Sequence, residues 1–303
     1  MDIYLPIAEM SVNALFILVL GGLVGVLSGM FGVGGGFLTT PLLIFYGIPP
    51  SVAVASATTQ ITGASVSGVL AHMRRGGVDF RMGGVMIAGG LVGSLVGAGI
   101  FRLLQASGQI DTVIGMLYVL LLGSIGILML RDSALALGWI KPSEEGASRP
   151  RHNRWIASLP LRWRFYASGL YLSPIAPLIL GFAAGILTVL LGIGGGFVLV
   201  PAMIYLFGMA ARVVVGTSLF MILAVSAATT MIHALTTQAV DIVLAALLLV
   251  GGVIGAQYGA ILTTRLKPDL LRLSLAVIIL LVALRMGLGL SYRPDEIFSI
   301  EYL

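Results

Sequence analysis

Two glycine-rich stretches contain the residues best suited to chemistry in this chain. "GVGGGF" ends at Phe37 and "GIGGGF" ends at Phe197, and a proline follows each after three further residues. A helix that begins at such a turn exposes backbone N–H groups, which attract anions together with the helix dipole. Glycine also removes the side chains that would keep a ligand away from the backbone. The two stretches therefore predict a pair of sites for a small anion.

Uncharged hydrogen-bond donors surround both stretches. No Asp, Glu, Lys or Arg occurs between Gly36 and Met73 or between Phe165 and Ala211, whereas Ser and Thr are frequent after each short apolar segment. Amides and hydroxyls that hold an anion without a full positive charge can release it again. The candidate binding residues are Gly34, Gly35, Gly36, Phe37, Thr39, Thr59, Gln60, Gly194, Gly195, Gly196, Phe197, Thr217, Ser218 and Thr230.

Two histidines are candidates for proton coupling, because the imidazole pKa lies near neutrality. They are His72 and His233, which fall at the same position of an internal repeat described below. His233 is the better candidate because Ser226, Thr229 and Thr230 precede it at helical spacing and form a polar stripe with it. A hydrogen-bonded or solvated histidine at the membrane interface is the alternative for both.

Other glycines and two aspartates have structural interpretations. Scattered glycines such as Gly89, Gly93 and Gly97 are typical of close helix packing in membranes, whereas three consecutive glycines are not needed for it. The triplets are therefore interpreted as lining a pathway. Asp79 and Asp241 precede apolar runs, and we expect each carboxylate to cap a helix N-terminus.

The composition is that of a protein dissolved in lipid. Of 303 residues 58% are hydrophobic and 10% are charged, and the mean hydropathy is +1.09. The apolar runs are continuous, unlike the alternating strands of a membrane barrel, so we predict an all-α polytopic membrane protein. There is no cysteine for disulfides or thiolate metal sites, and the basic residues form no single patch for nucleic acid. No GK[ST] motif is present, so the chain carries no ATP motor of its own.

The chain is an internal duplication. Residues 21–45 and 181–205 align without gaps, and 10 of the 25 positions are identical. We predict a first transmembrane repeat over 1–131, a cytoplasmic connecting loop over 132–167, and a second repeat with a tail over 168–303. The ten apolar segments are about 11–30, 37–48, 51–72, 83–103, 110–131, 168–191, 197–209, 212–236, 241–264 and 269–290.

The charge distribution predicts that the two repeats are inverted. With five crossings in each repeat, 14 of the 17 basic residues fall on one face, which is then cytoplasmic, and both termini are extracytoplasmic. The second and seventh segments are too short to cross about 30 Å of hydrocarbon alone. Short Gly/Pro-interrupted segments at corresponding places in two halves mark the binding site of many secondary transporters.

The duplicated "G[VI]GGGF…P" blocks, the joint "RRGGVDF" and the stretch "VVVGTSLF" resemble the sulfite exporter TauE/SafE family. The resemblance covers nearly the whole chain, and its glycine blocks correspond here to Gly32–Pro41 and Gly192–Pro201. It implies a transporter of small sulfur-containing anions, such as sulfite or sulfonates, in a prokaryotic cytoplasmic membrane. The identity of the anion, the direction of transport and the coupling ion stay open.

The leading hypothesis is a secondary transporter of a small oxyanion that works by alternating access. An uncoupled anion channel or uniporter and a transporter of another small metabolite are the alternatives. We expect no enzyme, because there is no HExxH motif, no paired intramembrane Asp and no Cys. We expect no cofactor and no metal. The expected partners are a small anionic substrate and the lipid bilayer, and a homo-oligomer is left open.

Overall fold

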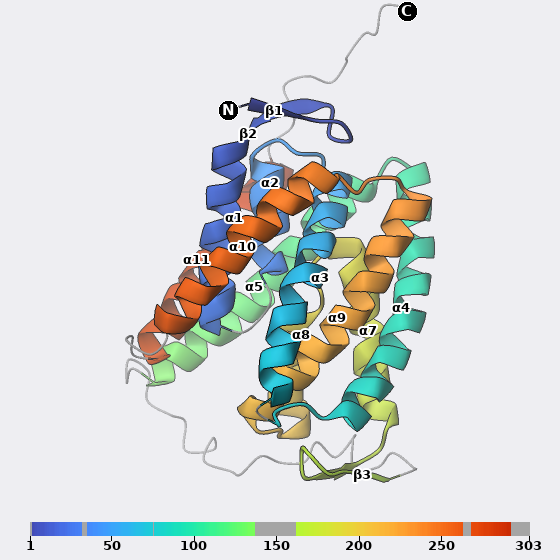
Figure 1. Ribbon diagram of the computed structural model, residues 1–303, viewed down its shortest axis with the longest axis vertical. Helices are drawn as coiled ribbons and strands as arrows, with labels where there is room; N and C mark the ends of the chain where they lie inside the picture. Colours follow the sequence, from blue (N-terminus) through green and yellow to red (C-terminus); the bar gives the residue numbers. More distant parts are fainter. Residues whose placement is uncertain (1, 32–34, 75, 137–161, 263–267, 292–303) are drawn as a thin grey trace, which may run out of the picture.

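The computed structural model describes residues 2–31, 35–74, 76–136, 162–262 and 268–291, which form a bundle of ten α-helices with two short β-hairpins (Figure 1). The predicted all-α class is confirmed. The helices are α1 (Ala14–Phe31), α2 (Gly36–Phe45), α3 (Pro50–Arg74), α4 (Phe80–Ala106), α5 (Ile110–Ala136), α7 (Ile175–Leu191), α8 (Gly196–Phe207), α9 (Ala211–Thr236), α10 (Ile242–Leu262) and α11 (Pro268–Ser291).

Several helices of the bundle have the length and the apolar surface of membrane-spanning helices. Among the described residues, five helices are long and apolar enough to cross a bilayer, namely α4, α5, α9, α10 and α11. Large apolar side chains such as Leu95, Leu120 and Leu281 are exposed on the outside of these helices, where lipid replaces water. The 25-residue α3 is not among the five, since it carries many Ser and Thr residues. The predicted polytopic membrane protein is confirmed.

Helices of one repeat pack along helices of the other. α1 lies along α10 and α4 lies along α7, while α3 pairs with α9 and α5 pairs with α11. Glycines allow the close approach in the first two pairs: a Cβ added at Gly25 would lie against the backbone of Gly252, and one at Gly93 would meet the carbonyl oxygen of Phe182. The packing interpretation of Gly89, Gly93 and Gly97 is therefore confirmed.

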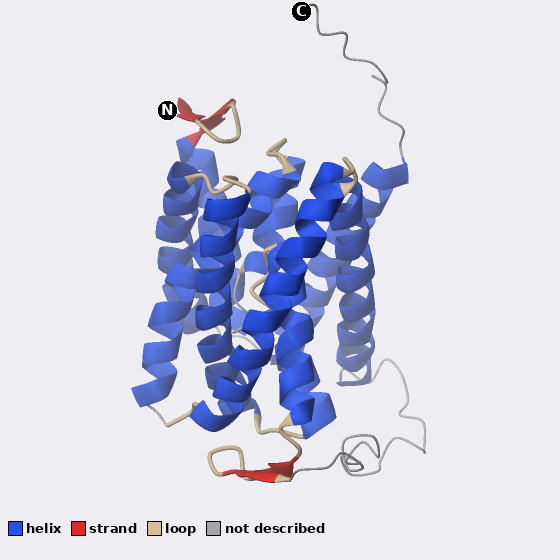
Figure 2. Cartoon of the chain, turned by 90° about the vertical axis from the view of Figure 1, so that its right-hand side faces the viewer, coloured by secondary structure: helices blue, strands red, loops and turns tan. Residues whose placement is uncertain are grey.

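One β-hairpin precedes the first helix of each repeat, and neither hairpin was predicted from the sequence. β1 (Asp2–Leu5) pairs with β2 (Met10–Asn13), and β3 (Trp163–Phe165) pairs with β4 (Leu170–Leu172). The predicted apolar segment over 168–191 was wrong at its start, because β4 occupies that stretch and α7 begins only at Ile175. The hairpins lie at opposite ends of the bundle, as expected for inverted repeats (Figure 2).

Asp79 joins the second hairpin to the first repeat. Its Oδ1 atom accepts the N–H groups of Arg81 and Met82, which confirms the predicted cap of α4. Its Oδ2 atom accepts the N–H group of Ser168 at 3.1 Å and the Ser168 hydroxyl at 2.8 Å, in the turn between β3 and β4. The carboxylate therefore caps a helix of one repeat and holds the hairpin of the other.

Asp241 joins the first hairpin to the second repeat in the same way. Its Oδ1 atom accepts the N–H group of Leu244 in α10, as predicted for a cap, and its Oδ2 atom accepts the N–H group of Ile7 in the first hairpin at 3.2 Å. The two repeats thus hold each other crosswise at both ends of the bundle.

The predicted division into 1–131, 132–167 and 168–303 stays a prediction. α5 continues to Ala136 and β3 begins at Trp163, and residues 137–161 of the connection lie outside the described residues. The last twelve residues, 292–303, lie outside them as well.

The close approach of α4 and α7 can be tested within one helix. We expect Gly93→Ala to lower the free energy of unfolding by about 1–3 kcal/mol, because its methyl group would push against the α7 backbone. Gly99→Ala, at a position of α4 with open space around it, is the matched control and should cause no loss. Thermal unfolding in detergent measures both, and equal stability of the two variants would contradict the packing account.

Candidate functional site

The two short helices α2 and α8 meet at their N-termini in the middle of the bundle. The rings of Phe37 and Phe197 are stacked, with their centroids 4.6 Å apart and an interplanar angle of 6°, and both are buried. α8 begins after Gly195, whose φ of +76° favours glycine, and α2 begins after Gly35. Because both N-cap residues are glycines, no side chain caps either helix.

Within the described part of the chain, the first N–H groups of both helices have no hydrogen-bond acceptor, and residues 32–34 before α2 lie outside that part. The N–H groups of Leu38 and Thr39 donate to the carbonyl oxygen of Gly35, and the equivalent bonds to Gly195 start α8. The buried residues whose N–H groups find no acceptor among the described residues are Gly36, Phe37, Gly196 and Phe197. Four backbone donors and the positive ends of two helix dipoles are therefore gathered at one buried place.

Two isoleucines cover the glycine turns. A Cβ added at Gly194 would lie 2.9 Å from Ile61 of α3 and 3.1 Å from Ile222 of α9, so no side chain fits there. The sequence reading missed both isoleucines, although the alignment that places His72 on His233 also places Ile61 on Ile222. In this conformation the turns are closely packed, and an anion reaches the amides only if the isoleucine side chains move.

A cluster of hydroxyls lies on the same two helices. The Thr62 hydroxyl is 3.0 Å from that of Ser226, and the Thr59 hydroxyl donates to that of Thr230 at 3.5 Å. The hydroxyls of Thr59, Thr62 and Ser226 also lie within hydrogen-bond distance of carbonyl oxygens one turn earlier in their own helices. Their protons are thus satisfied without a ligand, and rotation about one bond turns them toward one. Of this cluster, Thr59 and Thr230 belong to the predicted site.

The side chains of most remaining predicted residues are engaged in other hydrogen bonds. Gln60 donates to the Leu248 carbonyl oxygen in α10 at 3.4 Å, and Thr217 accepts the N–H group of Asp79 at 2.9 Å. The hydroxyls of Ser218 and Thr39 donate to carbonyl oxygens of their own segments. Gly34 lies outside the described residues.

His233 ties α9 to the end of α7. Its Nε2 atom is 3.1 Å from the carbonyl oxygen of Val189, its Nδ1 atom is 3.3 Å from the Thr237 hydroxyl oxygen, and its ring meets that of Phe101 edge-on. Two residues after Val189, the carbonyl oxygen of Leu191 accepts a hydrogen bond from the Tyr118 hydroxyl. These bonds satisfy carbonyl groups at the break after α7, a structural task that the sequence did not reveal.

His72 is half-buried, and its Cβ atom lies beside Gly216 of α9. A role of His233 or His72 in proton coupling stays a prediction. Among the described residues, no group of three or more His, Cys, Asp or Glu side chains could hold a metal ion.

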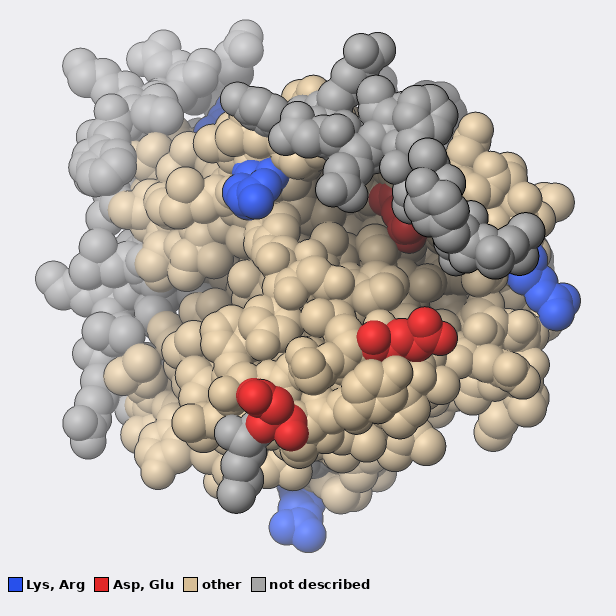
Figure 3. Space-filling view, turned by 90° about the horizontal axis from the view of Figure 1, so that it is seen from above, with Lys and Arg blue, Asp and Glu red and all other residues tan. Residues whose placement is uncertain are grey.

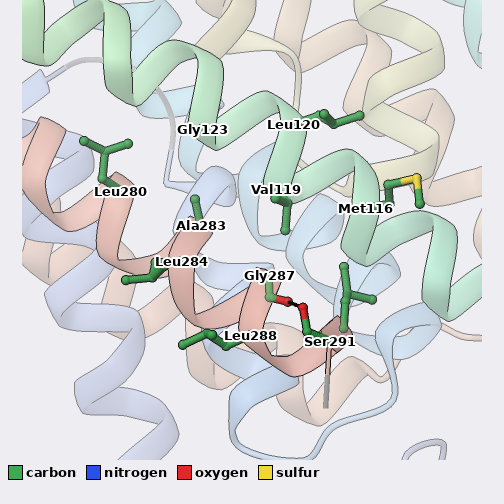
Figure 4. Close-up of a pocket in the computed structure, with 11 residues that line it drawn as sticks. Met116, Val119, Leu120, Gly123, Leu280, Ala283, Leu284, Gly287, Leu288 and Ser291 are labelled. Atoms are coloured by element: carbon green, nitrogen blue, oxygen red, sulfur yellow. Dashed lines mark hydrogen bonds between the residues drawn. The ribbon is translucent and has the colours of Figure 1, made fainter. Parts of the chain in front are cut away.

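An apolar groove lies between α5 and α11, away from the glycine turns. It has a volume of about 700 Å³ and is lined by Met116, Val119 and Leu120 on one side and by Leu284 and Leu288 on the other (Figure 4). The hydroxyl of Ser291 at its end already donates to the Gly287 carbonyl oxygen at 2.9 Å. This groove offers no donors for an anion.

Comparison with known proteins gives a consistent result. A family model described as "Sulfite exporter TauE/SafE" matches residues 17–286. The "Probable membrane transporter protein YjnA" of Bacillus subtilis is 31% identical over 89% of this chain and 98% of its own length. A "Probable membrane transporter protein" of Xylella fastidiosa is 28% identical over 87% of this chain and 91% of its own.

A plant relative matches a shorter stretch. The "Sulfite exporter TauE/SafE family protein 1" of Arabidopsis thaliana is 34% identical over 28% of this chain and 19% of its own length. No solved structure matches the chain significantly.

Proposed function

We propose that this chain, which belongs to the sulfite exporter TauE/SafE family of membrane transporters, carries a small oxyanion across the membrane by alternating access. Sulfite or an organosulfonate is the proposed substrate. The printed description of the family supports a sulfur oxyanion, and the chemistry of the buried helix starts supports an anion on independent grounds.

The observation that carries the proposal is the meeting of two uncapped helix N-termini inside the bundle. Leaving a buried N–H group without an acceptor costs about 1–3 kcal/mol, and the residues that begin α2 and α8 carry four N–H groups for which the described residues supply no acceptor. An oxyanion supplies several acceptor atoms at once and is favoured by both helix dipoles. Sulfite has three oxygens that point in different directions, which suits donors arriving from two opposed helices.

The Thr and Ser hydroxyls of α3 and α9 complete the proposed site. They stand on the helices whose isoleucines cover the turns, so that a shift of Ile61 or Ile222 would bring hydroxyls and amides to the same anion. No Lys or Arg occurs between Gly36 and Met73 or between Phe165 and Ala211, which keeps the proposed binding weak enough for release.

The inverted repeats support the alternating part of the proposal. Each repeat contributes one half-helix, one covering isoleucine and one hairpin, and the hairpins lie at opposite ends of the bundle (Figure 2). A small shift of one repeat against the other would uncover the site toward one end, and the mirrored shift would uncover it toward the other.

Two glycines at opposite ends of α8 test the site. Gly195→Ala and Gly208→Ala both place a side chain at positive φ, +76° and +67°, so the backbone strain is alike. Only Gly195 is closely surrounded, since its Cβ would lie 3.1 Å from Ala184, whereas Gly208 has open space. In proteoliposomes we expect Gly195→Ala to lower sulfite flux at least about tenfold, while Gly208→Ala keeps it. Equal flux in the two variants, with equal amounts of folded protein, would remove the turn from the mechanism.

An uncoupled uniporter is the second candidate, and the surroundings of His233 favour it. Both ring nitrogens of this histidine lie within hydrogen-bond distance of protein partners, and Asp79 and Asp241 are engaged as caps. Sulfite flux into proteoliposomes with and without an imposed proton gradient separates the two mechanisms. An uncoupled protein responds only to the sulfite gradient and the membrane potential. Uphill accumulation of sulfite driven by the proton gradient, and lost in His233→Gln, would establish proton coupling.

A further inference from the structure

The two hairpins occupy corresponding places in the two repeats, and the side chains and contacts that fold and anchor them correspond as well. At a constant offset of 160 residues, Leu5 corresponds to Phe165 and Val12 to Leu172, and all four side chains are buried. Each hairpin turn is held by an aspartate of the other repeat, as described above. The positions that fold and anchor the hairpins are thus alike, and differences elsewhere report something other than folding.

The outward-facing residues differ sharply between the hairpins. The first hairpin contains Asp2 and Glu9 and no basic residue, whereas the second, with the residue that leads into it, contains Arg162 and Arg164 and no acidic residue. Ile3, Pro6 and Ser11 of the first hairpin correspond to Trp163, Tyr166 and Tyr171 of the second. One end of the bundle has therefore acquired arginines and aromatic side chains that the fold does not need.

Two arginines, Arg81 of α4 and Arg164 of the second hairpin, lie over aromatic rings of this hairpin. The Arg81 guanidinium lies over the Trp163 ring at 5.0 Å from its centroid and donates to the Arg164 carbonyl oxygen at 3.2 Å. The Arg164 guanidinium lies over the Tyr166 ring at 5.7 Å. A guanidinium that is stacked on a ring keeps edge N–H groups for a bidentate bond to a phosphate.

No carboxylate neutralises these two arginines among the described residues. Asp79 is close in the chain but is only 2% exposed, and its oxygens already accept four hydrogen bonds, from Arg81, Met82 and Ser168. Both arginine side chains are exposed. Two exposed positive charges, for which the described residues supply no carboxylate partner, therefore lie at one end of the bundle.

The position of this cluster in the fold favours a lipid as the anion. Arg81 is the second residue of α4, one of the helices that cross the membrane, so it stands where the hydrocarbon ends. Tyr166 is 76% exposed, and Tyr171 of the same hairpin and Phe80 at the start of α4 are exposed as well. Tyr and Trp side chains are typical of the headgroup layer, where their rings face the acyl chains and their polar groups face water.

Toward the other end of the bundle, a single arginine of the described residues lies over a ring, Arg285 at 5.4 Å from the centroid of Phe45, and it is not part of the first hairpin. Viewed from the end that carries the first hairpin, the visible Lys, Arg, Asp and Glu side chains stand apart from one another on a largely uncharged surface (Figure 3).

We propose that the β3–β4 hairpin and Arg81 form a binding site for the phosphate of an anionic phospholipid headgroup, at one end of the bundle only. In this site Arg81 and Arg164 contact the phosphate, and Trp163 and Tyr166 hold the guanidinium groups and rest on the neighbouring lipid. The site fixes the start of α4 and the hairpin that precedes α7 to the membrane surface. It is independent of the proposed substrate and of the proposed transport mechanism.

The test uses Trp163 as the reporter. In the variant Trp139→Phe/Trp155→Phe, Trp163 is the only tryptophan of the chain. The full-length protein is placed in phosphatidylcholine nanodiscs that contain a small fraction of headgroup-spin-labelled phosphatidylglycerol or phosphatidylcholine, and quenching of fluorescence is measured. We expect the phosphatidylglycerol probe to quench at a mole fraction about 30-fold lower, as two basic residues at an anionic surface should provide.

The arginines and a matched control decide the assignment. Arg81→Gln/Arg164→Gln should abolish the preference for phosphatidylglycerol, whereas Arg102→Gln, at the opposite end of α4, should leave it unchanged. Thermal unfolding in pure phosphatidylcholine shows that the variants are folded, and Arg81→Lys/Arg164→Lys should restore part of the preference. The proposal is overturned if the Gln variant keeps the preference, if Arg102→Gln loses it equally, or if millimolar inorganic phosphate displaces the lipid, which would indicate a site for a soluble anion.

Discussion

Backbone hydrogen bonding is the constraint on which this structure depends. In a bundle surrounded by lipid, every N–H and C=O group must find a partner inside the protein, and helices satisfy nearly all of them. α2 and α8 begin in the middle of the bundle, after glycines that offer no capping side chain, and the described residues supply no acceptor for their first N–H groups. At the C-terminal end of α7, the carbonyl oxygens of Leu191 and Val189 have partners in the Tyr118 hydroxyl and the His233 ring. At the N-terminal side of each short helix the described residues supply no such partner, and on this asymmetry we base the proposal that the centre of the bundle binds an anion.

The rest of the architecture brings the two helix starts together and keeps them there. Glycine contacts hold α1 against α10 and α4 against α7, so each repeat is bound to the other along its length. Asp79 and Asp241 add a crosswise bond at each end of the bundle. Phe37 and Phe197 then stack where the pseudo-symmetric halves meet. The same contacts that hold the halves together also define the surfaces along which one could shift against the other.

Much of this could be read from the sequence because its signals were duplicated. The glycine triplets recur after 160 residues and the capping aspartates, Asp79 and Asp241, after 162, and a recurring feature stands out from chance. The hairpins were missed because each strand has only three or four residues and lies at the end of an apolar run, where no alternation can develop. Thr217 was assigned to the site by its type, whereas the fold uses its hydroxyl to accept the N–H group of Asp79. Such a contact joins positions far apart in the chain, and residue type alone cannot reveal it.

The central claim is that the first N–H groups of α2 and α8 hold the anion. It is tested most directly by labelling the protein with ¹⁵N-phenylalanine and following the amide signals of Phe37 and Phe197 by NMR during a titration with sulfite. The account predicts that both signals shift together and saturate at the same sulfite concentration, while the amide of Phe101, in the middle of a hydrogen-bonded helix, moves little. Saturable binding of sulfite that leaves the signals of Phe37 and Phe197 in place would contradict it.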